Sequence, residues 1–233
     1  MRLLALETSG DPASVALVVD GTLQAECSFP SRTALCRSLP ERLQSVVGGP
    51  PRPGSLDALA VSLGPGSFTG LRVGVALVKA LAQVLGVPLV GVPTHDAIAA
   101  GVPTQNGTLW VIQHARETDL YATRFHVRDD AWVADGPCQV VSVGALGATL
   151  VATSEPVLVV GEGLERHGQA LRAAAPHAVQ LGPDLWVPRA SRVGLLAAQR
   201  ILQADPDAVW NLRPIYVLAS QAERAQGVDL GLS

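Results

Sequence analysis

The residues best suited to chemistry lie in the glycine-rich stretch LGPGSFTGLRVG, residues 63–74. A glycine-rich turn that starts a helix often binds phosphate, because its backbone N–H groups and the helix dipole both favour an anion. The spacing matches no known motif of this kind. Five residues separate Gly64 from Gly70, and no lysine stands where a Walker loop requires one. The dinucleotide-binding spacing is exceeded by one residue, and Gly66 directly precedes Ser67, which excludes a nucleophile elbow.

Two interpretations of this stretch remain open. In the first it is a structural turn, where Gly64 and Gly66 take backbone angles that other residues avoid and Thr69 caps the next helix. In the second it keeps an anion or nucleotide site, either residual or shared with a partner. The residues of this candidate site are Gly66, Ser67, Thr69 and Arg72.

Few other residues have a type and spacing that suit catalysis or metal binding. Glu7 is the only carboxylate at the end of the first predicted strand, where a turn with hydroxyl side chains is the simpler interpretation. The segment Thr94-His95-Asp96 is expected to be a polar loop or a helix start. No two histidines have the H-x-x-x-H spacing that places two imidazoles on one helix face. We therefore predict no catalytic residues and no metal site in this chain.

The first half of the chain is expected to open with three antiparallel strands at 2–7, 13–19 and 22–29, and Asp20-Gly21 is the tight turn between the second and the third. The next predicted element is a helix at 31–47 that contains Pro40. It is either one kinked helix, which we favour, or a fresh helix that starts at a capping box on Ser38. The remaining elements are a buried strand at 56–63, a helix at 70–86 and a parallel strand at 87–92.

The second half repeats this plan more loosely. Strands are expected at 109–115, 121–127, 132–141 and 156–163, and helices at 141–150, 164–174 and 189–204. Ser191 is the expected N-cap of the last helix. The turn formers at 101–107 place the domain boundary, which gives an N-terminal domain at 1–103 and a C-terminal domain at 104–233. In this division the helix at 189–204 belongs to the second domain but can pack back on the first.

The helix expected at 70–86 is apolar almost all the way round, whereas a surface helix needs only one apolar stripe. Its sheet and the helix at 31–47 cover part of it. A partner chain then covers the rest, or the helix simply lies in the core. Periodicity does not separate these two possibilities.

Composition limits the class of protein. The 233 residues are 48% hydrophobic, with mean hydropathy +0.30, enough for a sizeable core. The net charge of −3 disfavours independent binding of nucleic acid. Three cysteines without a C-x-x-C pair are expected to be free thiols in a reducing cytoplasm. Glu7 interrupts the first apolar run too early for a signal peptide, and Arg72, Lys79 and Pro88 argue against a transmembrane helix at 71–92.

The chain resembles the TsaB (YeaZ) family, whose members are needed to make threonylcarbamoyladenosine in tRNA. The matching segments are LALETS (4–9), SVALVVDG (14–21), SLPERL (38–43), DALAVSLGPGSFTGLRVG (57–74), GVPLVGVPT (86–94), ARETDLYAT (115–123) and PIY (214–216). The resemblance implies an α/β fold of two actin-like subdomains (ASKHA, ribonuclease H-like), each a mixed sheet with flanking helices. In the actin-like superfamily an acid and a phosphate loop follow the first strand, where this chain has Glu7 and one glycine.

The resemblance also implies a role. Members of this family are non-catalytic relatives of the catalytic subunit TsaD, which holds the metal and ATP and transfers the threonylcarbamoyl group to adenosine. They bind and activate TsaD through two N-terminal helices, with TsaE as a further ATPase partner, and form homodimers through much the same surface. For this chain the implied partners are therefore a TsaD-type subunit, a TsaE-type ATPase and a second copy, with tRNA reached only through the complex. No cofactor is expected in this chain alone.

By the resemblance, the helices at 31–47 and 70–86 form the docking surface. The apolar side chains expected at this interface are Leu35, Leu39, Leu43, Val46, Leu71, Val75, Val78 and Leu81. The chain departs from the family pattern where Ala34 replaces a histidine, His114 an aspartate and Leu218 an arginine. The alternative function is an independent ATP-dependent phosphotransferase of the actin-like superfamily, which needs Glu7 as its metal-binding acid.

Overall fold

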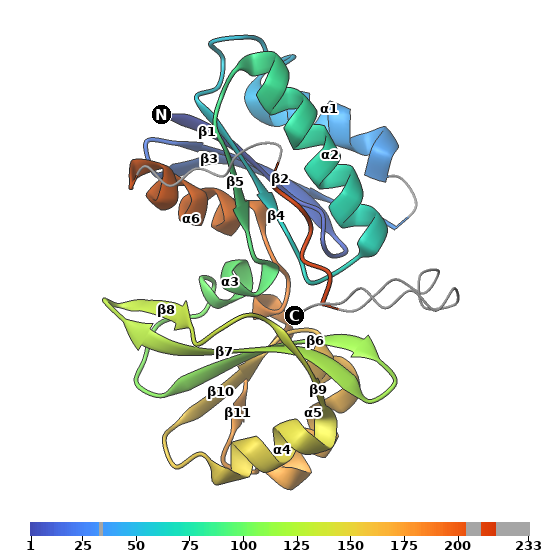
Figure 1. Cartoon of the computed structure of the whole chain (residues 1–233), viewed down its shortest axis with the longest axis vertical. Helices are drawn as coiled ribbons and strands as arrows, with labels where there is room; N and C mark the ends of the chain where they lie inside the picture. Colours follow the sequence, from blue (N-terminus) through green and yellow to red (C-terminus); the bar gives the residue numbers. More distant parts are fainter. Residues whose placement is uncertain (33–34, 204–210, 218–233) are drawn as a thin grey trace.

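The computed structural model describes residues 1–32, 35–203 and 211–217. Two β-sheets lie one above the other in Figure 1, with the first sheet and its helices in the upper half. Residues 2–92 supply the strands of the first sheet and residues 108–180 those of the second. The expected plan of two mixed sheets with flanking helices is confirmed.

The first sheet has the strand order β3-β2-β1-β4-β5. Its strands are β1 (Arg2–Glu7), β2 (Ala13–Val19), β3 (Thr22–Phe29), β4 (Ala58–Ser62) and β5 (Leu89–Val92). The first three form the predicted antiparallel meander. β4 pairs with β1 as a parallel strand, and β5 pairs with β4 in the same way. Nearly all residues of β1 and all residues of β4 are buried, since helices cover both faces of this sheet.

Three helices cover the first sheet: α1 (Leu35–Val47), α2 (Phe68–Leu85) and α6 (Ala190–Leu202). Leucine and valine side chains of α1 and α2 pack on one face, and α6 packs on the opposite face, which is rich in alanine. α1 is a single helix that contains Pro40, so the alternative of a fresh start at Ser38 is wrong. The N-cap of α6 is Arg189; Ser191 lies inside the helix and is buried, so its predicted capping role is wrong.

The second sheet has the strand order β11-β10-β6-β7-β8, and β9 also pairs with β7. Its strands are β6 (Thr108–Arg116), β7 (Asp119–Arg128), β8 (Ala131–Ala134), β9 (Gln139–Ser142), β10 (Val157–Val160) and β11 (Val179–Gln180). The single strand expected at 132–141 is wrong. Gly136-Pro137 divides it into β8 and β9, because proline has no N–H to donate to a neighbouring strand.

The second sheet is also covered on both faces. α4 (Val143–Ala152) and α5 (Gly163–Ala174) pack on one face, and α3 (Thr94–Ala99) packs on the other. α3 lies between the two sheets in Figure 1. A short 3-10 helix, η1 (Pro183–Leu185), follows β11 and is a feature that the sequence did not predict. Each half of the chain therefore contains a β-meander, a helix, a strand, a helix and a strand, in the same spatial order.

Candidate functional site

The glycine-rich stretch leads from the end of β4 into α2, and its geometry supports the structural interpretation. The N-cap is Ser67, whose Oγ accepts from the backbone N of Gly70 at 3.2 Å, so Thr69 is not the cap. The backbone N–H of Ser67 also donates to the carbonyl of Ser9 at 2.6 Å. Gly66 has φ 152° and lies so close to Ser9 that a Cβ would overlap it.

Two further glycines continue this close approach along α2. A Cβ on Gly70 would overlap the carbonyl oxygen of Thr8, and a Cβ on Gly74 would overlap the hydroxyl of the same threonine. Gly66, Gly70 and Gly74 recur every four residues, and in a helix this spacing places residues on one face. The glycines therefore let the start of α2 pack directly against the residues that follow β1.

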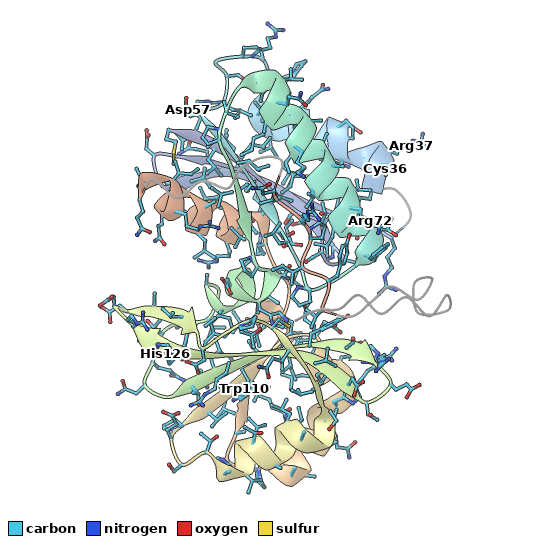
Figure 2. All side chains as sticks on the ribbon, viewed as in Figure 1. Cys36, Arg37, Asp57, Arg72, Trp110 and His126 are labelled. Atoms are coloured by element: carbon cyan, nitrogen blue, oxygen red, sulfur yellow. The ribbon has the colours of Figure 1, made fainter. Side chains whose placement is uncertain are left out.

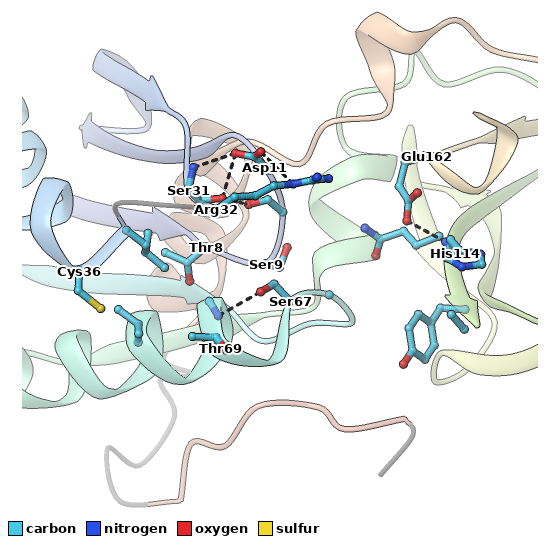
Figure 3. A pocket seen from close by; sticks show the side chains of 18 of the residues that line it. Thr8, Ser9, Asp11, Ser31, Arg32, Cys36, Ser67, Thr69, His114 and Glu162 are labelled. Carbon is cyan, nitrogen blue, oxygen red and sulfur yellow. Dashed lines mark hydrogen bonds and ion pairs between the residues drawn. The ribbon is translucent and has the colours of Figure 1, made fainter. Parts of the chain in front are cut away.

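A cleft of about 930 Å³ opens between the two halves beside this turn (Figure 3). Its walls come from the turns after β1 and β4, from the start of α1 and, on the opposite side, from β6, β7 and α5. Gly66, Ser67 and Thr69 of the predicted anion site line the cleft. Arg72, the fourth, is not among its lining residues. Among the described residues the structure thus brings three of the four together in this cleft.

Arg72 belongs instead to a cluster with the end of the described chain. Its guanidinium lies 3.8 Å from the centroid of the Phe68 ring, and its Nε donates to the hydroxyl of Tyr216 at 3.1 Å. The backbone N–H of Ile215 donates to the carbonyl of Leu63 at 2.7 Å. Residues 214–216, part of the family resemblance, therefore lie against the glycine-rich turn. Ala34 and Leu218, at which the chain departs from the family pattern, lie outside the described residues.

Glu7, the acid considered for a metal, is turned into the first half of the protein. The side chain is fully buried, and its Oε1 accepts from the backbone N of Ser9 at 2.5 Å. Burial raises the pKa of this carboxyl, and hydrogen bonds from Ser9 and Ser62 only partly oppose the shift. Glu7 does not line the cleft. Glu7 therefore does not fit the role of the metal-binding acid that follows the first strand in an actin-like kinase; the carboxylates that line the cleft are Asp11, Glu162 and Glu165.

The wall of the cleft formed by the second half carries a polar cluster around His114. The backbone N–H of His114 donates to Oε1 of Glu162 at 2.8 Å, and its Nε2 lies 3.1 Å from a guanidinium nitrogen of Arg166. The His114 and His167 rings stack with centroids 5.6 Å apart. Burial is the main reason why the pKa of Glu162 is raised. Sequence reasoning missed Glu162, and the internal repeat was the signal that could have found it. Glu162 follows β10 in the second half, just as the glycine-rich turn follows β4 in the first.

The remaining histidine of interest, His95, is not part of the cleft. It lies in α3, which confirms the helix-start interpretation, but the helix has no side-chain cap. Its Nδ1 lies 2.7 Å from the hydroxyl of Thr123, and burial lowers its pKa to about 3. His95 is thus a neutral side chain that links α3 to the second sheet. Within the described residues, no three His, Cys, Asp or Glu side chains are grouped to hold a metal.

The apolar residues predicted for the docking surface have a different place from the one expected. Seven of them are buried within this chain: Leu35, Leu39, Leu43, Val46, Leu71, Val75 and Val78. Leu81 is partly buried. These side chains pack on the first sheet, so they form the inner faces of α1 and α2. Their role at a partner interface stays a prediction, because a 3.6-residue pattern marks a buried face without showing what buries it.

A second apolar row remains on the outside of α2, and we call it the outer stripe. It consists of Val73, Ala76, Leu77, Ala80 and Val84. Ala76, Ala80 and Val84 are exposed, Val84 by 71%, and the other two are half-buried. By length and composition alone α2 could cross a membrane, but its inner face packs on the first sheet. An apolar row of this kind on a packed helix is typical of a protein contact.

Two halves with the same strand order and a cleft between them define an actin-like α/β protein. Comparisons with known proteins identify the family. Residues 52–223 match the family model described as TsaD, tRNA N6-adenosine threonylcarbamoyltransferase. The chain is 27% identical over 221 residues to the tRNA threonylcarbamoyladenosine biosynthesis protein TsaB of Escherichia coli (strain K12), covering 93% of this chain and 94% of that protein.

A second TsaB, from Bacillus subtilis (strain 168), is 26% identical and covers 96% of both chains. Among solved structures, YeaZ from Pseudomonas aeruginosa superposes with a TM-score of 0.73 at 22% identity and covers 92% of this chain and 99% of that one. The chain belongs to this family, in its TsaB (YeaZ) branch. The predicted fold and family are confirmed.

Proposed function

We propose that this chain is a non-catalytic activating subunit in the synthesis of N6-threonylcarbamoyladenosine beside the anticodon of tRNA. It acts by docking onto a TsaD-type catalytic subunit, with a TsaE-type ATPase as a further partner. It works in the cytoplasm, reaches tRNA only through the complex and contacts no membrane. The observation that carries the proposal is the outer stripe of α2, an apolar row that the described residues leave partly exposed.

The docking surface consists of the outer sides of α1 and α2, because the inner sides are already packed on the first sheet. A second copy of the chain can use the same surface, which gives a homodimer when the catalytic subunit is absent. The N-terminal domain at 1–103 supplies the surface, and the domain at 104–233 forms the opposite wall of the cleft.

The independent phosphotransferase is the weaker candidate because of Glu7. The acid expected to hold a nucleotide-bound metal, Glu7, is buried, and burial favours its protonated form. We therefore place ATP and metal in the partner subunit and none in this chain. Calorimetric titration of the chain alone with Mg-ATP is expected to show no tight binding; a tight complex would support the phosphotransferase.

The test of docking uses a charge placed on the outer stripe. Val84→Asp is expected to weaken binding to the TsaD-type subunit of the same genome at least about tenfold, because the charge would be buried without a partner. The matched control is Gln169→Asp, at an exposed position of α5. Affinity is measured by calorimetry, and modified nucleoside is measured in tRNA incubated with the complete system.

Two results would contradict the proposal. One is a V84D chain that binds the catalytic subunit as tightly as the wild type. The other is a catalytic subunit that modifies tRNA equally well without this chain.

A further inference from the structure

The two helices of the docking surface have a charge opposite to that of the whole chain. α1 and α2 together carry four cations, Arg37, Arg42, Arg72 and Lys79, and one carboxylate, Glu41. The complete chain has a net charge of −3. The docking surface is therefore cationic on an otherwise acidic protein.

The arginines of this surface keep their charge available to a partner. Arg72 stacks on Phe68 and bonds the Tyr216 hydroxyl, which are contacts to neutral groups. Arg37 is exposed at the start of α1, and Figure 2 shows it on the same side of the first half as Arg72. Within the residues that the structure describes, no ion pair joins Arg37, Arg42 or Arg72 to a carboxylate. Arg32, by contrast, pairs with Asp11 at 3.3 Å.

This charge distinguishes between the two possible occupants of the outer stripe. A symmetric dimer places the same surface on both sides of the contact, so its cations face cations. Like charges at an interface oppose association, whereas complementary charges speed it and select the partner. A partner with carboxylates around an apolar strip fits the surface better than a second copy does.

We propose that the docking surface selects an acidic surface of the catalytic subunit over a second copy of this chain. The inference rests on the proposed function and deepens it by stating the chemistry of the partner's contact surface. It gives the two associations opposite salt dependences. Salt screens attraction in the complex with the catalytic subunit and repulsion in the homodimer, so it weakens the first and strengthens the second.

The experiment compares Arg37→Glu with Arg192→Glu. Both residues are exposed on helices and both substitutions change the net charge equally, but Arg192 lies on α6, on the opposite face of the first sheet. Binding to the catalytic subunit is measured by calorimetry, and self-association by analytical ultracentrifugation. Both are measured in about 50 mM and about 500 mM NaCl, where screening differs strongly.

In the lower salt, R37E is expected to bind the catalytic subunit about tenfold more weakly than the wild type and to dimerise more tightly. Both differences should shrink in the higher salt, and R192E should behave as the wild type throughout. Equal binding of R37E and wild type to the catalytic subunit in low salt would overturn the inference. So would a wild-type homodimer that is tighter in low salt than in high salt.

Failure of the proposed function gives a different result. In that case the wild-type chain does not bind the catalytic subunit at either salt concentration. Failure of the charge inference shows instead as a complex that forms with the same affinity for the wild type, R37E and R192E.

Discussion

α2 and α5 occupy equivalent places in the two halves, yet they meet different surroundings. Each helix connects two neighbouring parallel strands, β4 to β5 and β10 to β11, and each packs one side on its sheet. The outer side of α5 carries charged and polar residues: Glu165, Arg166, Gln169 and Arg172. The outer side of α2 carries the outer stripe. The sheet-facing rows are alike, so the two helices differ in their outer rows, and the proposed docking of α2 rests on this difference.

The largest expected effect separates the two sides of α2 itself. Val78 is fully buried on the inner side, whereas Val84 is 71% exposed on the outer side. Val78→Asp is expected to lower the free energy of unfolding by about 4 kcal/mol, because it buries a charge without a partner. Val84→Asp is expected to change it by less than about 0.5 kcal/mol. Urea unfolding of both variants measures the difference, and equal destabilisation would contradict the assignment of the two sides.

A smaller effect on stability is expected at the glycines where the two helices come closest to their sheets. A Cβ on Gly74 of α2 would overlap the Thr8 hydroxyl at 2.2 Å, whereas a Cβ on Gly168 of α5 would meet only the end of the Gln180 side chain, at 3.0 Å. Gly74→Ala is expected to cost about 2 kcal/mol of stability, since overlap outweighs the better helix propensity of alanine. Gly168→Ala is expected to change stability by less than about 0.5 kcal/mol. Thermal unfolding that gives similar costs would show that α2 is packed no more tightly than α5.

The smallest effect is a pH dependence at the start of α5, where Glu162 takes the place that Ser67 has in α2. Burial raises the pKa of Glu162 above its ordinary value of 4.5, so the folded state holds the proton more tightly than the unfolded chain does. The stability from this group is present below pH 4.5 and is lost as the pH rises through the raised pKa.

Glu162→Gln is expected to remove this dependence, so the variant should gain stability relative to the wild type as the pH rises. Urea unfolding between about pH 4 and pH 8 measures the trend. Glu41→Gln, at an exposed position of α1, is the control and should follow the wild type. A parallel course of E162Q and wild type would show that Glu162 is not desolvated in the folded state.

Most of the fold could be predicted from local patterns. The strands of the first half appear at the predicted positions because RLLALE and ASVALVV are continuous apolar runs, and Asp20-Gly21 closes a tight turn between strands. The start of α2 was misplaced by two residues because Ser67 and Thr69 are both good caps, and the contact of Ser67 with Ser9 decides between them. The division at Gly136-Pro137 was missed because its flanks remain strand-like.

Less of the candidate site could be predicted from the sequence. Gly66, Ser67 and Thr69 were recognised as a group, but the association of Arg72 with Tyr216 joins residues 144 positions apart. His114 and Glu162 line the opposite wall of the cleft, and no local motif connects them to the glycine-rich turn. The sequence could not separate the sheet-facing side of α2 from its outer side, since both sides of this helix are apolar and only packing distinguishes them.

By itself, the sequence determined the order of the elements, the family and the absence of the familiar phosphate-binding spacings, because these depend on residue types and distances along the chain. The tertiary structure alone decided that the glycines serve close packing, that Glu7 points inward and that the outer stripe stays partly exposed. These are properties of what a side chain meets in space, and contacts between distant segments form only when the chain is folded.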